Sequence, residues 1–97
     1  MSTDKNKDAF YKKLRQQLID TSLWPSIYLY KFIVKTDKEK IIQIEELFNN
    51  MGAVINTVKS KNGNYTSVSV NVKMKNPEAV IAKYREIEYN IEGVISL

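Results

Sequence analysis

The stretch from Ser60 to Lys73 reads SKNGNYTSVSVNVK, and it decides the fold. A turn signal, Asn62-Gly63, stands just before nine residues in which polar and apolar side chains alternate. Alternation at period two places one set of side chains on each face of a β-strand. One set consists of Thr66, Val68, Val70 and Val72, and the other of Tyr65, Ser67, Ser69, Asn71 and Lys73. The stretch therefore predicts half of a β-hairpin, with one face on a core and the other face free.

The residues ahead of this hairpin predict a strand followed by a helix. The segment 26–35 (SIYLYKFIVK) is rich in aromatic and β-branched residues, which favour strands. A capping box formed by Thr36 and Glu39 then predicts a helix that ends at Gly52. We expect the core side of the strand to carry Tyr28, Tyr30, Phe32 and Val34. We expect the core side of the helix to carry Ile41, Ile44, Leu47, Phe48 and Met51.

The second strand, residues 53–60, can pair with the third in two registers. A two-residue Asn-Gly turn pairs Thr57 with Val68, whereas a three-residue loop closed by Gly63 pairs Asn56 with Val68. We expect the three-residue loop, because it keeps the two valines of the second strand on the core face. That register buries Val54, Asn56 and Val58, exposes Ile55 and places Lys59 beside Tyr65.

The C-terminal quarter of the chain predicts a second crossover helix and a short strand. Asn76-Pro77 provides a cap and a proline at the first helical position, and Gly93 ends the segment before the strand 94–97. The buried stripe of this helix is expected to be Val80, Tyr84, Ile87 and Ile91. The element order βαββαβ predicts an α+β fold, a ferredoxin-like two-layer sandwich with a four-stranded antiparallel sheet and one open face.

The N-terminal residues 1–23 are an addition to this plan, and residues 24–97 are expected to form the ferredoxin-like domain. We expect 1–7 to be a disordered charged leader and 8–20 to be an amphipathic helix, whose stripe is Phe10, Leu14 and Leu18, widened by Tyr11 and Ile19. Trp24-Pro25 ends the helical continuation, because a residue before proline favours an extended backbone. Trp24 is expected to anchor the extension to the core rather than to stack on a ligand.

Composition excludes several function classes. The 97 residues carry a net charge of +4 and contain neither Cys nor His, so the chain has no thiol nucleophile, no disulfide and no imidazole base. We therefore expect no catalytic residues, no cofactor and no metal. No apolar run approaches the length of a membrane span, and the N-terminus has no signal-peptide core. The expected location is the cytoplasm, with no membrane contact.

Three parts of the chain match a known family pattern. They are Trp24-Pro25 before an aromatic YxYKF strand, the run from Gly63 to Val70 (GNYTSVSV), and a helix with Tyr84 before an isoleucine- and valine-containing end. In these features residues 24–97 resemble the YbeD-like family of small uncharacterised bacterial proteins. The resemblance implies a ferredoxin-like fold and a comparison with ACT-type regulatory domains, which bind small effectors at dimer interfaces. The N-terminal helix departs from the shorter members of that family.

The strand segments are basic and predict the binding surface. Residues 26–35 and 53–75 contain six lysines and no acid, while the two crossover helices are rich in Glu. We expect the open face to bind a small anionic ligand or an acidic protein partner, or to form a homodimer. The candidate residues are Lys31, Lys59, Tyr65, Ser67, Ser69 and Lys73. The plainer alternative is that lysines at strand ends protect sheet edges and keep the chain soluble.

Two further function classes stay open at this point. In one, the chain is a structural or adaptor protein assembled through its N-terminal helix. In the other, it binds nucleic acid weakly. Sequence disfavours nucleic acid, because Tyr65 is the one aromatic residue among the positions expected to stack bases, and a single stack supplies about 1–3 kcal/mol.

Overall fold

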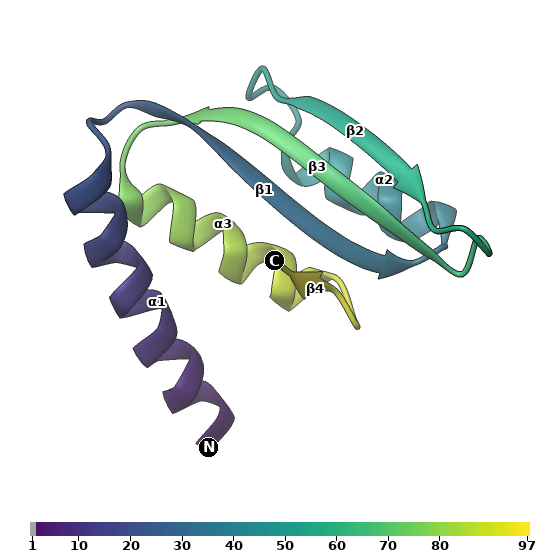
Figure 1. The fold of residues 1–97 in the computed structure, drawn as a ribbon, viewed down its shortest axis with the longest axis horizontal. Helices are drawn as coiled ribbons and strands as arrows, with labels where there is room; N and C mark the ends of the chain where they lie inside the picture. The colour runs from purple at the N-terminus through teal and green to yellow at the C-terminus, as the bar shows by residue number, and fades with distance from the viewer. Residues whose placement is uncertain (1) are drawn as a thin grey trace.

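The computed structural model describes residues 2–97, and the side chains of residues 6–97. Three helices lie beside a four-stranded antiparallel sheet (Figure 1), so the predicted α+β class and antiparallel sheet are confirmed. The elements in chain order are α1 (Ser2–Thr21), β1 (Ser26–Lys35), α2 (Lys38–Leu47), β2 (Val54–Lys59), β3 (Tyr65–Met74), α3 (Pro77–Asn90) and β4 (Ile95–Ser96).

The sheet has the order β2-β3-β1-β4, with the two longest strands at its centre. β1 and β3 pair along their whole length, from Ser26 opposite Met74 to Lys35 opposite Tyr65. β4 pairs with β1 at only two positions, and the amide of Leu97 adds one bond to the carbonyl of Lys31 at 2.9 Å. All three helices pack on one face of this sheet, so the other face carries no helix.

The core lies between the central strands and the helices, and the predicted core faces of β1, β3, α2 and α3 are confirmed. Buried side chains supplied by the strands are Tyr30, Phe32, Val34, Thr66, Val68, Val70, Val72 and Met74. Those supplied by the two crossover helices and the residues that directly follow them are Ile44, Phe48, Val80, Tyr84, Ile87 and Ile91. Each large apolar side chain buried in this way contributes roughly 1.5–3 kcal/mol. The Tyr30 hydroxyl donates to the carbonyl oxygen of Val80 at 2.9 Å, which satisfies its polar end.

The predicted register of the β2–β3 hairpin is wrong. In the structure Thr57 lies opposite Val68 and Lys59 lies opposite Thr66, which is the register of the two-residue alternative. Directly opposed residues share a face of the sheet. Ile55 therefore points to the core and packs against it, while Val54 and Val58 are 61% and 65% exposed.

Side-chain hydrogen bonds in a four-residue loop, residues 61–64, account for this register. The Ser60 hydroxyl accepts from the amide of Tyr65 at 3.0 Å, and Asn62 Oδ1 accepts from the amide of Asn64 at 3.2 Å. The Gly63 amide donates to the carbonyl of Ser60 at 2.9 Å, with Gly63 at φ +79°. Gly63 lies in the loop as predicted, but the loop is one residue longer than the predicted loop, and it shifts every position of β2 to the opposite face.

The helix caps agree with the sequence at α3 and differ at α2. Asn76 caps α3 as predicted, since its side chain accepts from the amide of Ala79 at 2.8 Å. At α2 the cap is Asp37, which accepts from the amide of Glu39 at 2.9 Å. Thr36, the predicted cap, instead shares a hydrogen bond of 2.9 Å with the hydroxyl of Thr66. α2 also ends at Leu47, before the predicted stop at Gly52, and turns complete the connection.

The N-terminal helix is longer than predicted and lies beside α3 (Figure 1). It starts at Ser2 rather than Asp8, so the expected disordered leader is helical from residue 2, and Met1 lies outside the described residues. Tyr11 is its buried centre at 5% exposure, whereas Phe10, expected in the stripe, is 62% exposed. Trp24 packs against the core and donates from its indole nitrogen to the carbonyl of Leu18 at 3.1 Å. This position agrees with the predicted anchoring role.

Candidate binding face

The side of the sheet without helices, called the open face below, presents a group of apolar side chains. Most of them are exposed, with Tyr65 45% and Leu29 55% exposed. They come from all four strands and alternate with the buried core positions. The apolar members are Ile27, Leu29, Ile33, Val54, Val58, Tyr65 and Ile95. An apolar group of this size on one surface is typical of a contact site.

Five of the six predicted site residues lie on this face, spread along β1 and β3. Lys31 of β1 stands directly opposite Ser69 of β3, near the centre of the sheet. Ser67 stands opposite Ile33 and next to Val58, and Tyr65 and Lys73 lie at opposite ends of β3. The sixth residue, Lys59, was expected on the same face. That prediction is wrong, because Lys59 lies opposite the buried Thr66 and so occupies the helix side of the edge strand.

Two hollows flank Tyr65 at the end of the sheet near the β2–β3 loop. One, of about 340 Å³, is lined by Lys35, Asn64 and Tyr65. The other, of about 200 Å³, is lined by Ile33, Val58, Lys59, Ser60, Tyr65 and Ser67, with Lys59 reaching it from the sheet edge. A half-exposed tyrosine between two hollows is the kind of residue that often dominates the energy of a protein contact.

The open face carries one sign of charge. Lys31, Lys35 and Lys73 lie on it, and none of the four described strands contains Asp or Glu. The acids of the described chain lie instead in the helices and their connections. A surface with lysines and no compensating carboxylate attracts acidic groups. This attraction weakens as the salt concentration rises.

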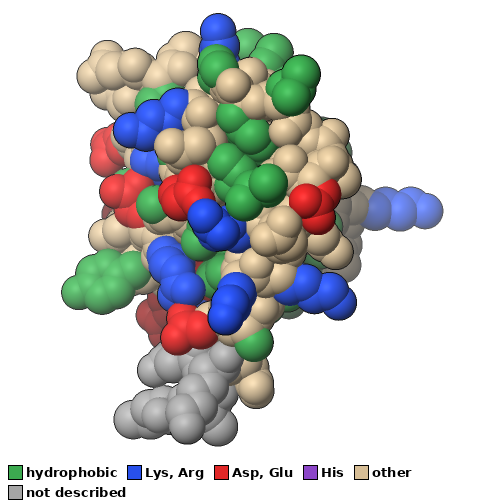
Figure 2. Space-filling view, turned by 90° about the vertical axis from the view of Figure 1, so that its left-hand side faces the viewer, with side chains coloured by type: hydrophobic (Ala, Val, Ile, Leu, Met, Phe, Trp, Pro, Cys, Tyr) green, Lys and Arg blue, Asp and Glu red, His purple; other side chains and the backbone are tan. Residues whose placement is uncertain are grey.

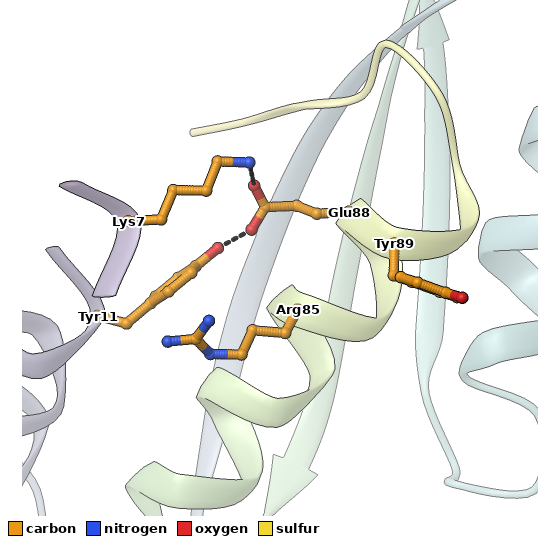
Figure 3. Close-up of a pocket in the computed structure, with 5 residues that line it drawn as sticks. All are labelled: Lys7, Tyr11, Arg85, Glu88 and Tyr89. Atoms are coloured by element: carbon orange, nitrogen blue, oxygen red, sulfur yellow. Dashed lines mark hydrogen bonds and ion pairs between the residues drawn. The ribbon is translucent and has the colours of Figure 1, made fainter. Parts of the chain in front are cut away.

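A second polar cluster joins α1 to α3 on a flank of the molecule. Figure 2 views the molecule from the side of α1, where hydrophobic side chains form a broken band and basic and acidic side chains are intermixed around it. The Glu88 carboxylate accepts from Lys7 Nζ at 2.7 Å and also from the Tyr11 hydroxyl, while Tyr89 points away from them (Figure 3). Arg85 lies over the ring of Tyr11, 4.8 Å from its centroid.

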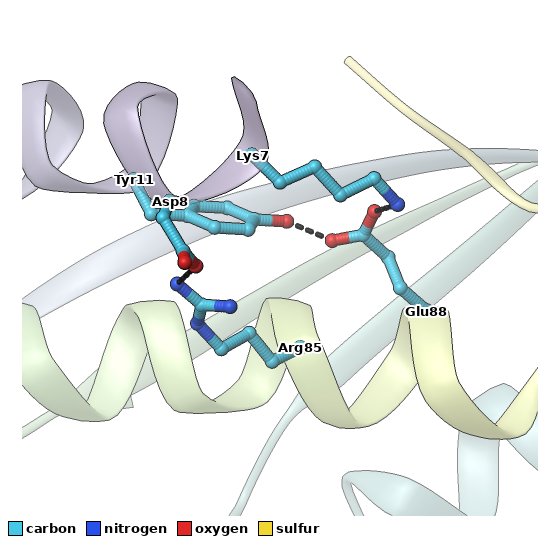
Figure 4. A network of polar contacts seen from close by, with 5 residues as sticks. All are labelled: Lys7, Asp8, Tyr11, Arg85 and Glu88. Carbon is cyan, nitrogen blue, oxygen red and sulfur yellow. Dashed lines mark hydrogen bonds and ion pairs between the residues drawn. The ribbon is translucent and has the colours of Figure 1, made fainter. Parts of the chain in front are cut away.

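The same cluster continues along both helices. Arg85 donates to the carboxylate of Asp8 at 2.8 Å (Figure 4), and Arg15 pairs with Glu78 at the start of α3. A hydrogen bond from its own backbone amide, followed by the Arg15 guanidinium, lowers the pKa of Glu78. Because most of these pairs are solvent-exposed, each contributes little. These polar contacts therefore orient α1 along α3, and the buried side chain of Tyr11 anchors the helix.

Residues 21–95 match the model of a family described as proteins of unknown function, DUF493. The chain belongs to this family. The resemblance to the YbeD-like family is consistent with that membership. The chain has no significant match among curated proteins, and none among solved structures. The family match includes every open-face residue named above, the last of which is Ile95. It leaves almost all of α1 outside.

Sequence reasoning found the open-face members of β1 and β3, exchanged the two faces of β2, and missed the α1–α3 cluster. The signal was present in the sequence, since α3 carries Glu78, Arg85 and Glu88 at spacings of seven and three residues, and α1 carries Lys7, Asp8 and Arg15. Two helices with such complementary charges can pair along their length. No helix within residues 2–97 combines the length and hydrophobicity needed to cross a membrane. Among the described side chains, no three acids gather where they could hold a metal ion.

Proposed function

We propose that this member of the family is a non-enzymatic regulatory or binding module whose open face captures an acidic protein partner. One observation carries the proposal: exposed apolar side chains from all four strands share a surface with three lysines and no acid. Burial of apolar area would supply the affinity, and the lysines would select partners that carry carboxylates around an apolar centre.

The charge pattern favours a different protein over a second copy of this chain. A face-to-face pair of identical sheets would bring the central Lys31 residues of the two copies close together, with no carboxylate on either strand layer to separate them. Like charges placed across an interface are destabilising. A homodimer through this face is therefore the less favoured arrangement.

A protein partner is also favoured over a small anion. Each hollow beside Tyr65 has a single lysine among its lining residues. Tight capture of a small anion calls for several donors that converge on it. Two hollows beside a tyrosine instead suit side chains that project from another protein.

The strand order supports a finer description of the fold. Taken from the other edge, the order is β4-β1-β3-β2, with β1 and β3 central and antiparallel and each crossover helix joining a central strand to an edge strand. A split βαβ sandwich has the same order, and this agreement supports a ferredoxin-like, ACT-like interpretation. In such a module the sheet face is free for regulation through binding.

The proposal is tested by affinity capture from an extract of the source cells, with the tagged chain as bait and crosslinked peptides identified by mass spectrometry. Wild type is compared with Lys31→Glu, which reverses the central charge of the open face. The expected result is a partner that Lys31→Glu loses and that crosslinks to β1 or β3 through a segment rich in Asp and Glu.

Lys38→Glu provides the matched control. It makes the same charge change at the exposed first residue of α2, where a helix N-terminus favours an acid. If the Lys31→Glu variant still captures the partner, as the Lys38→Glu variant is expected to do, the proposal is contradicted. A stable dimer of the isolated chain in light scattering, lost in Lys31→Glu, would replace the acidic partner with a second copy.

A structural role through α1 is the second candidate, and one observation favours it. Phe10 and Ile19 on α1 are 62% and 42% exposed although the helix is docked along α3. If α1 is the contact element, Phe10→Ser abolishes capture and Lys31→Glu does not. The same capture experiment therefore separates the two candidates.

A further inference from the structure

A crevice of about 220 Å³ lies on the helix side of the sheet, between α1, α3 and the end of the chain. Its described lining residues are Phe10, Tyr11, Leu14, Tyr28, Tyr84, Ser96 and Leu97. None of the open-face residues takes part, so this crevice is separate from the surface proposed above.

The size of the crevice suits a small molecule rather than a peptide or a large cofactor. An engineered apolar cavity of about 150 Å³ binds benzene, whereas drug-sized ligands occupy about 300–1,000 Å³. At about 220 Å³ the crevice falls between these two cases. It therefore has room for a single substituted ring or an aliphatic chain of similar volume.

The lining is apolar except for hydroxyl groups. The hydroxyls of Tyr28 and Tyr84 lie 2.8 Å apart and share one hydrogen bond. Two hydroxyls carry two protons, and one shared bond uses one of them. Among the described residues neither hydroxyl has another hydrogen-bond partner, so the pair retains one donor.

This donor and the hydroxyl of Ser96, which also lines the crevice, set the chemistry of the ligand. A molecule with a hydrogen-bond acceptor, such as a carbonyl oxygen, can accept that proton while its apolar part contacts the rings. None of the seven lining residues carries a charged side chain, so nothing in the lining would compensate the desolvation of an ionic ligand. The favoured ligand is therefore neutral.

We propose that the crevice between α1, α3 and the end of the chain binds small neutral aromatic or aliphatic molecules that carry a carbonyl-type acceptor. The rings of Tyr11, Tyr28 and Tyr84 form the apolar wall, and the hydroxyl pair gives the site its preference for an acceptor. The site is independent of the open face and of any protein partner bound there.

The test is a titration of the full chain followed by two-dimensional NMR, with three probes of similar size. Acetophenone has a ring and a carbonyl, ethylbenzene lacks the acceptor, and benzoate carries a charge. Acetophenone is expected to give saturable shifts at residues of the crevice. Ethylbenzene is expected to bind about fivefold more weakly, and benzoate not to bind. Absence of saturable shifts with acetophenone overturns the proposal.

Variants then locate the site and test the hydroxyls. Tyr28→Phe/Tyr84→Phe removes both hydroxyls and keeps both rings, a change that leaves no polar group of the pair unpaired. It is expected to reduce the preference for acetophenone over ethylbenzene, and the further change Ser96→Ala to remove what the Ser96 hydroxyl contributes. The single variants each keep one hydroxyl and should preserve the preference. A preference that is as large in the double variant as in the wild type overturns the assigned role of the pair.

Ser96→Phe fills the crevice from the end of the chain, and Lys12→Phe adds the same ring to an exposed position of α1 that does not line it. Ser96→Phe is expected to abolish the acetophenone shifts, and Lys12→Phe to leave them intact. Unchanged binding to Ser96→Phe would place the ligand elsewhere and overturn the proposal. Lys31→Glu, the open-face variant, is expected to bind acetophenone normally, which keeps this test separate from that of the protein partner.

Discussion

The ring of Tyr11 in α1 stacks on the ring of Tyr84 in α3, with centroids 5.9 Å apart and planes inclined by 30°. Both side chains are 5% exposed. Tyr84 also packs against the aromatic residues of β1, with its centroid 4.8 Å from that of Tyr30. The N-terminal helix is therefore connected through Tyr84 to the aromatic centre of the core, and it contributes to the stability of the domain.

Removal of the Tyr11 ring should weaken this connection strongly. Tyr11→Ala is expected to lower the free energy of unfolding by about 3 kcal/mol, because a buried aromatic side chain is lost and a cavity remains. Its neighbour Phe10 provides the control, since Phe10→Ala truncates an exposed ring of similar size and should cost well under about 1 kcal/mol. Urea denaturation measures both values, and equal costs would contradict the docked position of α1.

The hairpin register makes a second prediction. Ile55 packs against the core and Val58 is exposed on the other face. Ile55→Ala should therefore cost about 1–2 kcal/mol, less than for a fully buried isoleucine, and Val58→Ala should cost under about 0.5 kcal/mol. The reverse order in thermal or urea unfolding would restore the register predicted from the sequence.

Sequence patterns identified the sheet strands, the crossover helices and most of the core, because β3 and α3 each have one periodicity that is clearly apolar and β1 has a row of aromatic residues on one face. β2 has no such periodicity. Its sequence VINTVK places apolar residues on both faces, at Val54 and Val58 and at Ile55, so alternation could not choose between them. The choice depends on hydrogen bonds of the Ser60 and Asn62 side chains in the loop, which a pattern of hydrophobicity does not contain.

The packing position of α1 could not be predicted from the sequence, for a similar reason. An apolar stripe showed that the helix packs on something, but stripes on α1 and α3 do not specify which pair of surfaces meets. That choice depends on Tyr11 fitting beside Tyr84 and on the charges of Lys7, Arg85 and Glu88. The same contact encloses the crevice, so the crevice could not be predicted before the helix was placed.

Stability should fall in alkaline solution because of the buried tyrosines. Burial raises the pKa of Tyr30 and, together with a hydrogen bond to Tyr28, that of Tyr84. Above about pH 10 the unfolded chain releases these protons while the folded chain keeps them, so the free energy of unfolding decreases as pH rises. Below about pH 10 both states keep the protons, and this contribution is fully present.

The size of the alkaline effect can be assigned with one variant. Each retained proton contributes a slope of up to about 1.4 kcal/mol per pH unit. Urea unfolding between about pH 9 and about pH 11 should show a shallower slope for Tyr30→Phe than for the wild type. Identical slopes would mean that Tyr30 ionises equally in both states, contrary to its complete burial.

The polar cluster between α1 and α3 makes a prediction about salt. Glu88→Gln removes the charge that pairs with Lys7, and should destabilise the docked helix by less than about 1 kcal/mol, since the pair is partly exposed. The difference from wild type should shrink between about 0.1 M and about 1 M salt, as the screening length falls from about 10 Å to about 3 Å. Hydrogen exchange at the amides of α1 measures the docking.

Glu86→Gln is the matched control for this measurement. Glu86 pairs with Lys83 of the same helix at 2.5 Å, whereas the described ion pairs between α1 and α3 involve Glu78, Arg85 and Glu88. Its replacement should leave exchange in α1 unchanged at either salt concentration. An equal effect of the two substitutions would show that the charge of α3 as a whole, and not the pair with Lys7, governs the docking of α1.

The crevice has walls of two origins. Tyr28 and Tyr84 belong to the segment 21–95 that the family shares, whereas α1 and the residues after Ile95 lie outside it. Substitutions in α1 can therefore reshape the crevice without altering a single strand pairing of the sheet. The lining of the crevice and the open face can therefore change independently of each other.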